Sequence, residues 1–328
     1  MYRTTRRSLV RAAPSPILAP VLAPILTSVL VATMWVLALV LVVPLLASAP
    51  ADAEPGVSRR GGVPSAVQAP TRVRVVSHNI EKRTAALQRS FKIARRSKAE
   101  VILLQEVCWW QAADVRSQHP EWTISYIPER NRDRCQNRGY GGDTLGLRRK
   151  VGNLAIWTGA PTGGSSTVVF DHQRVNSDNA GLACVAWIDV VRHRACSAHL
   201  IAPQSREDVR TRTLQARETS QVAASWIAQD DVVLLGGDFN AEPNRRTMRF
   251  LYKRGGKGSF REAAELHSGD RQCQCARRTI DNRPVKIDYI FFSANRAGAH
   301  TRRKLRIIRT VSDHHLLVGW ADMDTSVR

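Results

Sequence analysis

One stretch, VVLLGGDFNAEPN at residues 232–244, constrains the fold of this chain more than any other. Its first four residues are apolar, which predicts a short buried strand. Gly236 and Gly237 then end the strand, and Asp238 and Asn240 follow at its tip. Residues two apart in an extended chain point to the same side, so the carboxylate and the amide can address one target. A strand that ends in an Asx turn explains the same residues without any catalysis.

The amino terminus predicts an export signal or a single transmembrane anchor. Residues 1–11 are basic, residues 12–51 carry no charge, and residues 25–43 are almost continuously apolar. That length can span a bilayer as a helix and exceeds the apolar core of a typical signal peptide. Cleavage-like sequences at 47–49 and 51–53 keep both interpretations open. In either case the basic start predicts a cytoplasmic amino terminus and an extracellular or cell-surface domain.

Composition divides the remaining chain into a linker and one folded domain. After the leader at residues 1–53, residues 54–72 are rich in glycine and proline, which predicts a flexible linker. Residues 73–322 contain no repeat and no second linker, so we expect a single catalytic domain there. Within it, residues 128–150 are polar and rich in arginine, and predict a long surface loop.

Cysteine usage agrees with export. The six cysteines are Cys108, Cys135, Cys184, Cys196, Cys273 and Cys275. An even number in an exported protein indicates disulfide bonds. Cys184 and Cys196 flank a predicted hairpin and form the best-placed pair, and Cys108 with Cys135 is a second, weaker pairing. The last two cysteines are too close together for an easy mutual bridge.

The formal net charge of the chain is +21. Four of the arginines lie within the first eleven residues, which leaves +17 for the part from residue 52 onward. Such an excess favours polyanionic partners such as nucleic acid, anionic lipid or an anionic polymer. A basic surface that is merely solvated is the alternative.

Polar side chains stand at or just beyond the ends of most predicted strands. They are Asn79, Glu106, His199, Asp238, Asn240, Asp313 and His314. Each has an ordinary explanation alone, such as a helix cap for an asparagine. If the strands line up in one sheet, however, their ends come together, and the combined groups suit hydrolysis of a phosphate ester.

A hard divalent cation takes oxygen ligands and keeps some of its water, so one or two carboxylates are enough to hold it. We expect Mg²⁺, with Ca²⁺ or Mn²⁺ as alternatives. Glu106 is the first choice of ligand, with Asn79 and Asp313 beside it. The cation would neutralise phosphoryl oxygens and stabilise the charge that develops on them.

The remaining groups suit proton transfer. Asp238 is expected to accept a proton from the attacking water, while Asn240 holds the water or the phosphate. A protonated His314 would stabilise the transition state, and His199 would donate a proton to the leaving oxygen. Asp288, in the stretch IDYIFF, is expected to orient one of the two histidines, because a carboxylate fixes an imidazole tautomer and raises its pKa.

Seven short stretches carry a family resemblance. In chain order they are SHNIEK, LLQEV, GNLAIW, SAHL, GGDFNAEP, IDYIFF and VSDHHL. Together they resemble the endonuclease/exonuclease/phosphatase superfamily, the group of deoxyribonuclease I and the apurinic/apyrimidinic endonucleases, over residues 73–321. The resemblance implies an α/β fold, a four-layer sandwich of two mixed β-sheets packed face to face with helices outside. It also implies cleavage of phosphate esters that depends on Mg²⁺ or Ca²⁺.

The resemblance also implies residue roles. Matched motif by motif, it puts the metal and phosphate positions at Asn79 and Glu106, the paired histidines at His199 and His314, the water-activating pair at Asp238 and Asn240, and supporting acids at Asp288 and Asp313.

One part of the family pattern is not matched. Deoxyribonuclease I-like members carry a tyrosine and a glutamate before the GN motif, where this chain has the arginine-rich residues 128–150. Tyr140 and Asp143 are the nearest candidates there, so the acid behind one histidine stays unassigned.

The superfamily includes nucleases, sphingomyelinases and inositol-phosphate phosphatases. Arginines near the predicted catalytic loops favour DNA or RNA as substrate, through salt-dependent contacts with phosphates. They are Arg130, Arg132, Arg134, Arg138, Arg148, Arg149, Arg245, Arg246 and Arg249. We therefore expect an exported endonuclease, monomeric, and attached to the membrane only if its leader is retained.

Two alternatives remain open. A sphingomyelinase-like phosphodiesterase or phosphoinositide phosphatase would act on anionic or choline phospholipid, and would be expected to show an exposed aromatic hairpin. Trp109 and Trp110 are the only candidates for one. A non-catalytic polyanion-binding module is the second alternative, although no predicted catalytic residue is missing.

Overall fold

The computed structural model describes residues 69–131, 135, 149–159, 163–173, 180–202, 205–253, 256–265, 278–298, 301 and 303–326. The predicted leader and anchor, nearly all of the predicted linker and most of the arginine-rich loop lie outside these residues, as do Cys273 and Cys275. Among the helices that are described, none is long and apolar enough to cross a membrane.

The described strands form two six-stranded sheets. The first has the order β11-β12-β1-β2-β4-β3. Its strands are β1 (Thr71–Asn79), β2 (Val101–Cys108), β3 (Thr123–Asn131), β4 (Lys150–Trp157), β11 (Arg303–Ile308) and β12 (Leu316–Met323). Only β1 and β2 run parallel to each other, so this sheet is mixed.

The second sheet has the order β5-β6-β7-β8-β10-β9. Its strands are β5 (Gly164–Val169), β6 (Gly181–Ile188), β7 (Arg192–His199), β8 (Val232–Asp238), β9 (Phe260–Glu262) and β10 (Asp288–Ser293). Here β7 and β8 form the parallel pair and the other pairs are antiparallel.

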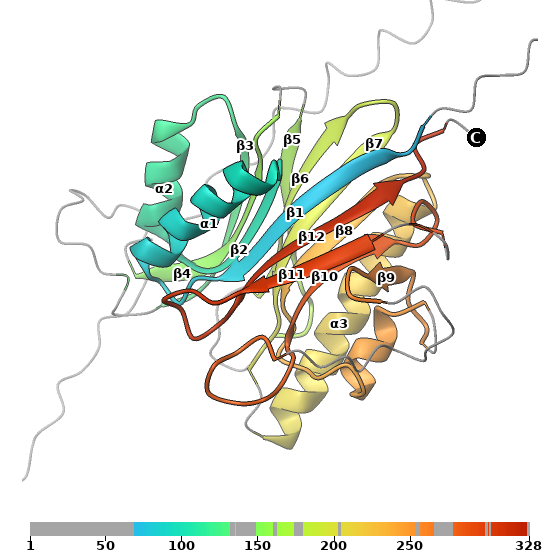
Figure 1. Ribbon diagram of the computed structural model, residues 1–328. Coiled ribbons are helices and arrows are strands. Elements are labelled where there is room, and N and C mark those ends of the chain that lie inside the picture. The colour runs from blue at the N-terminus through green and yellow to red at the C-terminus, as the bar shows by residue number, and fades with distance from the viewer. Residues whose placement is uncertain are drawn as a thin grey trace, which may run out of the picture. The chain divides into compact units, whose positions relative to one another are not determined.

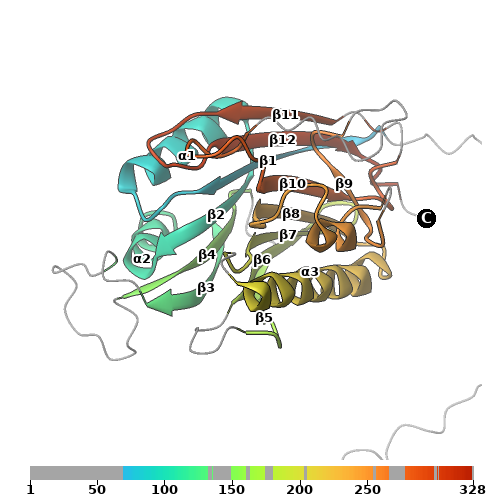
Figure 2. The same cartoon turned by 90° about the horizontal axis from the view of Figure 1, so that it is seen from below.

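Helices cover the outer face of each sheet. α1 (Thr84–Ser97) and α2 (Trp109–Gln118) pack on the first sheet, and α3 (Arg206–Ile227) with the short 3₁₀ helix η2 (Arg246–Phe250) lies on the second. Figure 2 shows α1 and α2 on one side of the two sheets and α3 on the other. The four layers confirm the predicted sandwich of two mixed sheets with helices outside.

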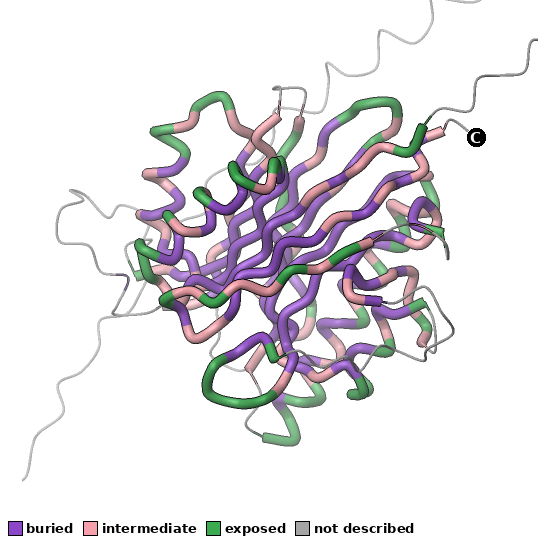
Figure 3. Tube along the Cα trace, in the orientation of Figure 1, coloured by how far each residue is buried: buried purple, intermediate pink, exposed green. Residues whose placement is uncertain are grey.

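Alternation along the strands creates these layers, because successive side chains of a strand point to opposite faces. Val75 lies in the apolar cluster between the two sheets, whereas its neighbour Val76 packs under α1 and α2. In the same way Leu234 faces the first sheet and Leu235 faces α3. Both faces of the central strands are therefore buried, as Figure 3 shows by its continuous purple strands.

Both predicted disulfides are present. Cys184 and Cys196 stand directly opposite each other in the β6–β7 hairpin, with their Cα atoms 4.1 Å apart. Cys108, at the end of β2, is joined to Cys135 with a Cα separation of 5.3 Å. The hairpin pairing follows from facing positions on antiparallel strands, which bring Cβ atoms close enough to bridge.

Some element boundaries differ from the sequence predictions. β3 runs past residue 128, where the sequence predicts the start of a surface loop, and ends at Asn131, because it continues pairing with β4 past an irregularity after Pro128. β9 was not predicted, because three residues are too few to show a periodic pattern.

Strand register explains why the polar ends meet. In the first sheet Asn79 is paired with Gln105, so Glu106 follows one position further along β2. In the second sheet His199 is paired with Asp238, which is paired in turn with Asp288 at the start of antiparallel β10. The polar groups of each sheet therefore lie in one row, at the carboxyl ends of the parallel strands.

Candidate active site

The tip of β8 is built from a glycine and a tight turn. Gly237 has φ 156°, and a Cβ atom there would lie 1.9 Å from the carbonyl oxygen of Ala198, so no other residue fits. Beyond it, Asp238 Oδ1 accepts a hydrogen bond from the backbone N–H of Asn240 at 2.9 Å. Asn240 has φ 49° and donates its side-chain amide to the Leu200 carbonyl at 2.9 Å. The Asx turn is thus real, and it uses only one oxygen of the carboxylate.

The other oxygen of Asp238 faces three polar side chains. Asp238 Oδ2 accepts from the Asn79 amide at 3.2 Å. It also lies 3.5 Å from His199 Nε2 and 3.6 Å from His314 Nε2. Asp238 is only 2% exposed, and burial raises its pKa, because a buried carboxylate loses its hydration. One buried carboxylate oxygen therefore stands between two imidazoles, with a link to the opposite sheet.

His314 is held by a second carboxylate. Its Nδ1 lies 3.0 Å from Asp288 Oδ1 and 3.1 Å from Oδ2. Burial disfavours the charged ring, but the negative charges of Asp288 and Asp238 outweigh it and raise the pKa of His314 to about 10. The ring is therefore protonated at neutral pH, with its Nε2 directed toward Asp238.

His199 has a carboxylate partner that the sequence analysis missed. Its Nδ1 lies 3.4 Å from Oε2 of Glu129, at ion-pair distance. Glu129 is 7% exposed, and its other oxygen accepts from the Asn153 amide at 2.6 Å. Asn153, the asparagine of the GN motif, also donates to the Gly181 carbonyl at 3.0 Å and so joins β4 to β6.

Glu129 takes the place that was left open for the acid behind a histidine. The candidates Tyr140 and Asp143 lie outside the described residues, whereas Glu129 sits within β3 and points into the site. The sequence predicts a loop from residue 128 onward, whereas the strand β3 continues to Asn131 and contains Glu129. Glu129 is visible in the sequence at Pro-Glu-Arg-Asn, but Asp133 and Asp143 also precede the GN motif, so the sequence alone does not single it out.

Glu106 is the centre of a cluster of charges at the mouth of the site. Its carboxylate forms ion pairs with Lys82 and, at 3.3 Å, with Arg130. The backbone supports this placement: the Lys82 N–H donates to the Glu106 carbonyl at 2.9 Å, and both residues have positive φ, 65° and 53°. Such left-handed conformations are unfavourable for residues with a side chain and are often found at functional sites.

The donor chemistry at this mouth fits a hard cation. Glu106 and Asn79 offer carboxylate and amide oxygens in adjacent register, and the side chain of Asp313 is 43% exposed at the rim. The ion pairs of Glu106 with the Lys82 ammonium and the Arg130 guanidinium show that this position attracts positive charge. Oxygen donors of this kind suit Mg²⁺, Ca²⁺ or Mn²⁺.

A second set of donors lies deeper. Ligand atoms of Asp238, Asp288 and His314 all come within 4.8 Å of one another. Because the His314 ring is protonated and hydrogen-bonded through Nδ1, a cation there would meet a like charge and would have to displace a proton. The mouth around Glu106 is therefore the better cation site, and the deeper set is better suited to proton transfer.

The structure brings most of the predicted site residues together. Direct contacts join Asn79, Asp238, His199, His314 and Asp288 across both sheets. Asn240 belongs to the turn at Asp238, and Glu106 stands one register step beyond Asn79. Asp313 is the most peripheral of them: its side chain is 43% exposed, and its carboxylate lies 4.0 Å from His314 Nε2.

Comparisons with known proteins agree with this arrangement. A sequence profile of the endonuclease/exonuclease/phosphatase family matches residues 76–314. No curated protein matches the chain in sequence. Among solved structures, truncated TDP2 from Caenorhabditis elegans is 18% identical, with 76% of this chain and 98% of that chain covered and a TM-score of 0.51. The human Nocturnin catalytic domain is 16% identical, with 77% and 94% covered and a TM-score of 0.52.

A third similar structure is a protein of Beutenbergia cavernae described as an endonuclease/exonuclease/phosphatase. It is 15% identical, with 77% of this chain and 72% of that chain covered and a TM-score of 0.54. At such identities these structures show a shared fold and nothing more.

Proposed function

Since this chain belongs to the endonuclease/exonuclease/phosphatase family, we propose that it is an exported, metal-dependent phosphodiesterase, and that it cuts DNA or RNA as an endonuclease. One observation carries the proposal. Asp238 Oδ2 is buried between His199 and His314, each of which has its own carboxylate partner. A base flanked by two oriented imidazoles is suited to attack by water on a phosphate ester.

The proposed reaction follows from these positions. Asp238 accepts a proton from the attacking water, as the water oxygen forms a bond to phosphorus. Protonated His314 stabilises the negative charge that grows on the phosphoryl oxygens. His199 donates a proton to the leaving oxygen as its bond to phosphorus breaks.

Positioning groups complete the site. Asn240 is fixed through its bond to Leu200 and can hold the water or the phosphate. Asn79, Glu106 and Asp313 would hold the divalent cation, with Glu106 as the main ligand. When bound, the cation supplies neutralisation of the phosphoryl charge.

Nucleic acid is favoured over lipid by the surface of the molecule. In the described part of the chain, the large apolar side chains that are well exposed are all aliphatic: Val169, Ile188, Val190, Val209 and Val311. Trp110, one of the two aromatic candidates for entering a lipid surface, packs instead against Cys108, Cys135 and Val151. The net charge of +21 suits a polyanion.

Export is supported by the two disulfides, because such bonds persist mainly in oxidising compartments. Together with the uncharged leader, they support an extracellular or cell-surface location for the catalytic domain.

The test uses the full chain with supercoiled plasmid and, separately, with sphingomyelin liposomes, each with Mg²⁺ or with EDTA. We expect nicking of the plasmid that needs the metal and is lost in Asp238→Asn. Asp189→Asn, an exposed aspartate outside the site, is the matched control and should nick normally. Release of phosphocholine without nicking would show that the protein is a lipid phosphodiesterase and not a nuclease.

A further inference from the structure

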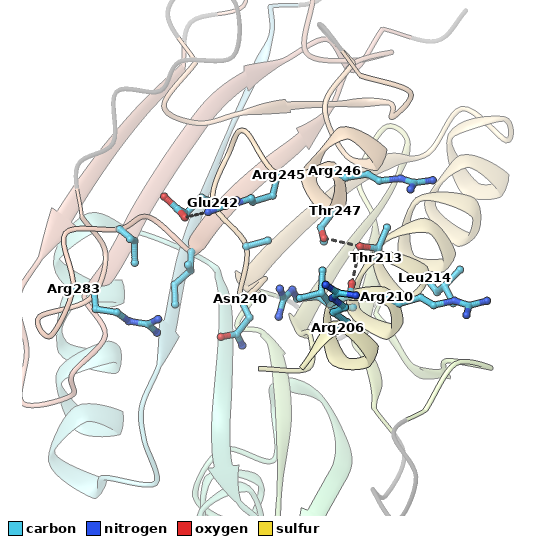
Figure 4. A pocket seen from close by; sticks show the side chains of 15 residues that line it. Arg206, Arg210, Thr213, Leu214, Asn240, Glu242, Arg245, Arg246, Thr247 and Arg283 are labelled. Carbon is cyan, nitrogen blue, oxygen red and sulfur yellow. Dashed lines mark hydrogen bonds and ion pairs between the residues drawn. The ribbon is translucent and has the colours of Figure 1, made fainter. Parts of the chain in front are cut away.

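An arginine-lined cleft opens beside the catalytic turn. It has a volume of about 870 Å³ and reaches Asn240 at one end. The six arginines that line it are Arg206, Arg210, Arg212, Arg245, Arg246 and Arg283. We name this feature the arginine cleft. In Figure 4, Asn240 lies between Arg283 on one side and Arg206 and Arg210 on the other.

The charge of the arginine cleft is almost entirely positive. Among the described residues that line it, Glu242 is the only acid, and it is paired with Arg245 at 3.1 Å. Arg206 and Arg210 are one helical turn apart on α3, where two like charges are unfavourable unless an anion lies between them. An anionic occupant would relieve this repulsion.

Arg212 connects the arginine cleft to the catalytic carboxylate. It is only 5% exposed, and it donates through Nη1 to the Ile201 carbonyl at 3.1 Å, while its Nε has no hydrogen-bond partner among the described residues. Burial lowers the pKa of Arg212, and the charges of Asp238 and Asp208 oppose that shift. Arg212 thus lines the cleft and also interacts electrostatically with Asp238.

The lining also limits what the cleft can recognise. No aromatic side chain lines it in the part of the chain that the structure describes, so these residues offer bases no stacking partner. Its volume of about 870 Å³ is in the range of ordinary ligand sites. Phosphates meeting arginines without base contacts give binding that tolerates any sequence and weakens strongly with salt.

We propose that the arginine cleft binds the phosphates of one nucleic-acid strand next to the phosphate that is cut. This inference rests on the proposed nuclease function, which it deepens: the strand is held by its phosphate backbone alone. The chain should therefore show no base preference at these positions.

Binding, not cleavage, is the decisive measurement. Fluorescence anisotropy of a labelled single-stranded 12-mer is recorded with the Asp238→Asn chain in EDTA, over roughly 50 to 200 mM salt. The test variant adds Arg206→Ala, Arg210→Ala and Arg246→Ala. We expect its Kd to rise at least about tenfold, and the slope of log K against log salt to become shallower by about 2, since each lost phosphate contact removes roughly 0.7.

Two controls separate a local site from bulk charge. Lys92→Ala, Arg95→Ala and Arg96→Ala remove the same three charges from exposed positions on or near α1, in the opposite outer layer, and should change the slope little. Lysines at the three cleft positions should restore most of the salt dependence, which shows that the alanine variant failed through charge and not through folding.

Each outcome decides something. Equal losses in the two alanine variants, or no loss in the cleft variant, would overturn the arginine cleft as a strand site. If the cleft variant loses binding to phosphatidylserine vesicles but keeps binding to the 12-mer, the occupant is a lipid surface. A chain that binds the strand through the cleft but cuts no phosphodiester would leave this inference standing and reject the proposed function.

Discussion

The side-chain amide of Asn79, at the end of β1, donates to Asp238 Oδ2, at the end of β8, over 3.2 Å. Both residues are almost fully buried, at 1% and 2% exposure, and they belong to different sheets. The bond therefore fixes the proposed catalytic base across the interface between the two sheets. Figure 1 labels the two strands, β1 and β8, from which these side chains come.

Asn79→Ala should remove this link and leave the buried oxygen with only its imidazole neighbours. We expect the rate of plasmid nicking to fall by about 100-fold, and the free energy of unfolding by about 1 to 3 kcal/mol, the usual cost of an unsatisfied buried group. Initial rates and urea melts measure the two effects. Asn282→Ala, at an exposed position, is the control. A variant as active as the wild type would show that the amide does not position the base.

Asp288→Asn tests the support of His314. Because the Asp288 carboxylate contacts Nδ1 and helps to keep the ring charged, its loss should lower kcat by about 100-fold or more with little change in KM. The chain offers a matched control next to it: His315 Nε2 lies 2.9 Å from Asp281, outside the site. Asp281→Asn removes a similar histidine partner and should leave kcat within about twofold. Equal losses in both variants would indicate a general effect on folding.

Glu129→Gln tests the acid that only the structure revealed. It keeps the shape of the side chain but removes the charge that faces His199 at 3.4 Å. We expect kcat to fall by about 10- to 100-fold, because His199 loses the carboxylate that lies against its Nδ1 and positions the ring. Glu121→Gln, at the exposed His119–Glu121 pair of 3.2 Å, should have no effect. Retained activity in Glu129→Gln would show that the Glu129 carboxylate does not assist His199 in catalysis.

The sequence predicted the catalytic residues at strand ends better than it predicted the residues that support them or bind the substrate. Asp238, His199 and Asn79 stand at the ends of apolar strands, and strand ends meet wherever sheets form, so their convergence was predictable. Glu129 was not, because which acid faces which imidazole depends on how the two sheets are placed against each other. The arginine cleft was predicted only in part: Arg245 and Arg246 were expected near the catalytic loops, whereas the arginines of α3 and Arg283 were not, because no sequence period connects them to the site.

Lys82→Met tests competition at the cation site. The Lys82 ammonium is paired with the Glu106 carboxylate, so a divalent cation has to compete with it or share it. Removing the charge should tighten Mn²⁺ binding by roughly fivefold, the equivalent of about 1 kcal/mol, as measured by electron paramagnetic resonance of free Mn²⁺. Lys92→Met, at an exposed position on α1, should leave the Kd unchanged. Weaker binding in Lys82→Met would mean that the lysine assists the cation and does not compete.

His193 gives the fold a dependence on pH that is independent of catalysis. The ring is 1% exposed and stacks on Trp187 at 4.9 Å, and neither nitrogen has a hydrogen-bond partner among the described residues. Burial lowers its pKa to about 4, although the nearby charges of Asp189 and Asp231 favour protonation and that of Arg296 opposes it.

The sign of the effect follows from proton uptake. As the pH falls below 6.5, His193 binds a proton in the unfolded chain but not in the folded one until about pH 4, so stability decreases across this window. His193→Phe keeps a stacked ring without a titrating group. Between pH 7 and pH 4 its free energy of unfolding should fall by about 2 to 3 kcal/mol less than that of the wild type. Urea unfolding at both pH values measures the difference. A wild-type pH profile in His193→Phe would show that the folded protein does not disfavour protonation of this ring.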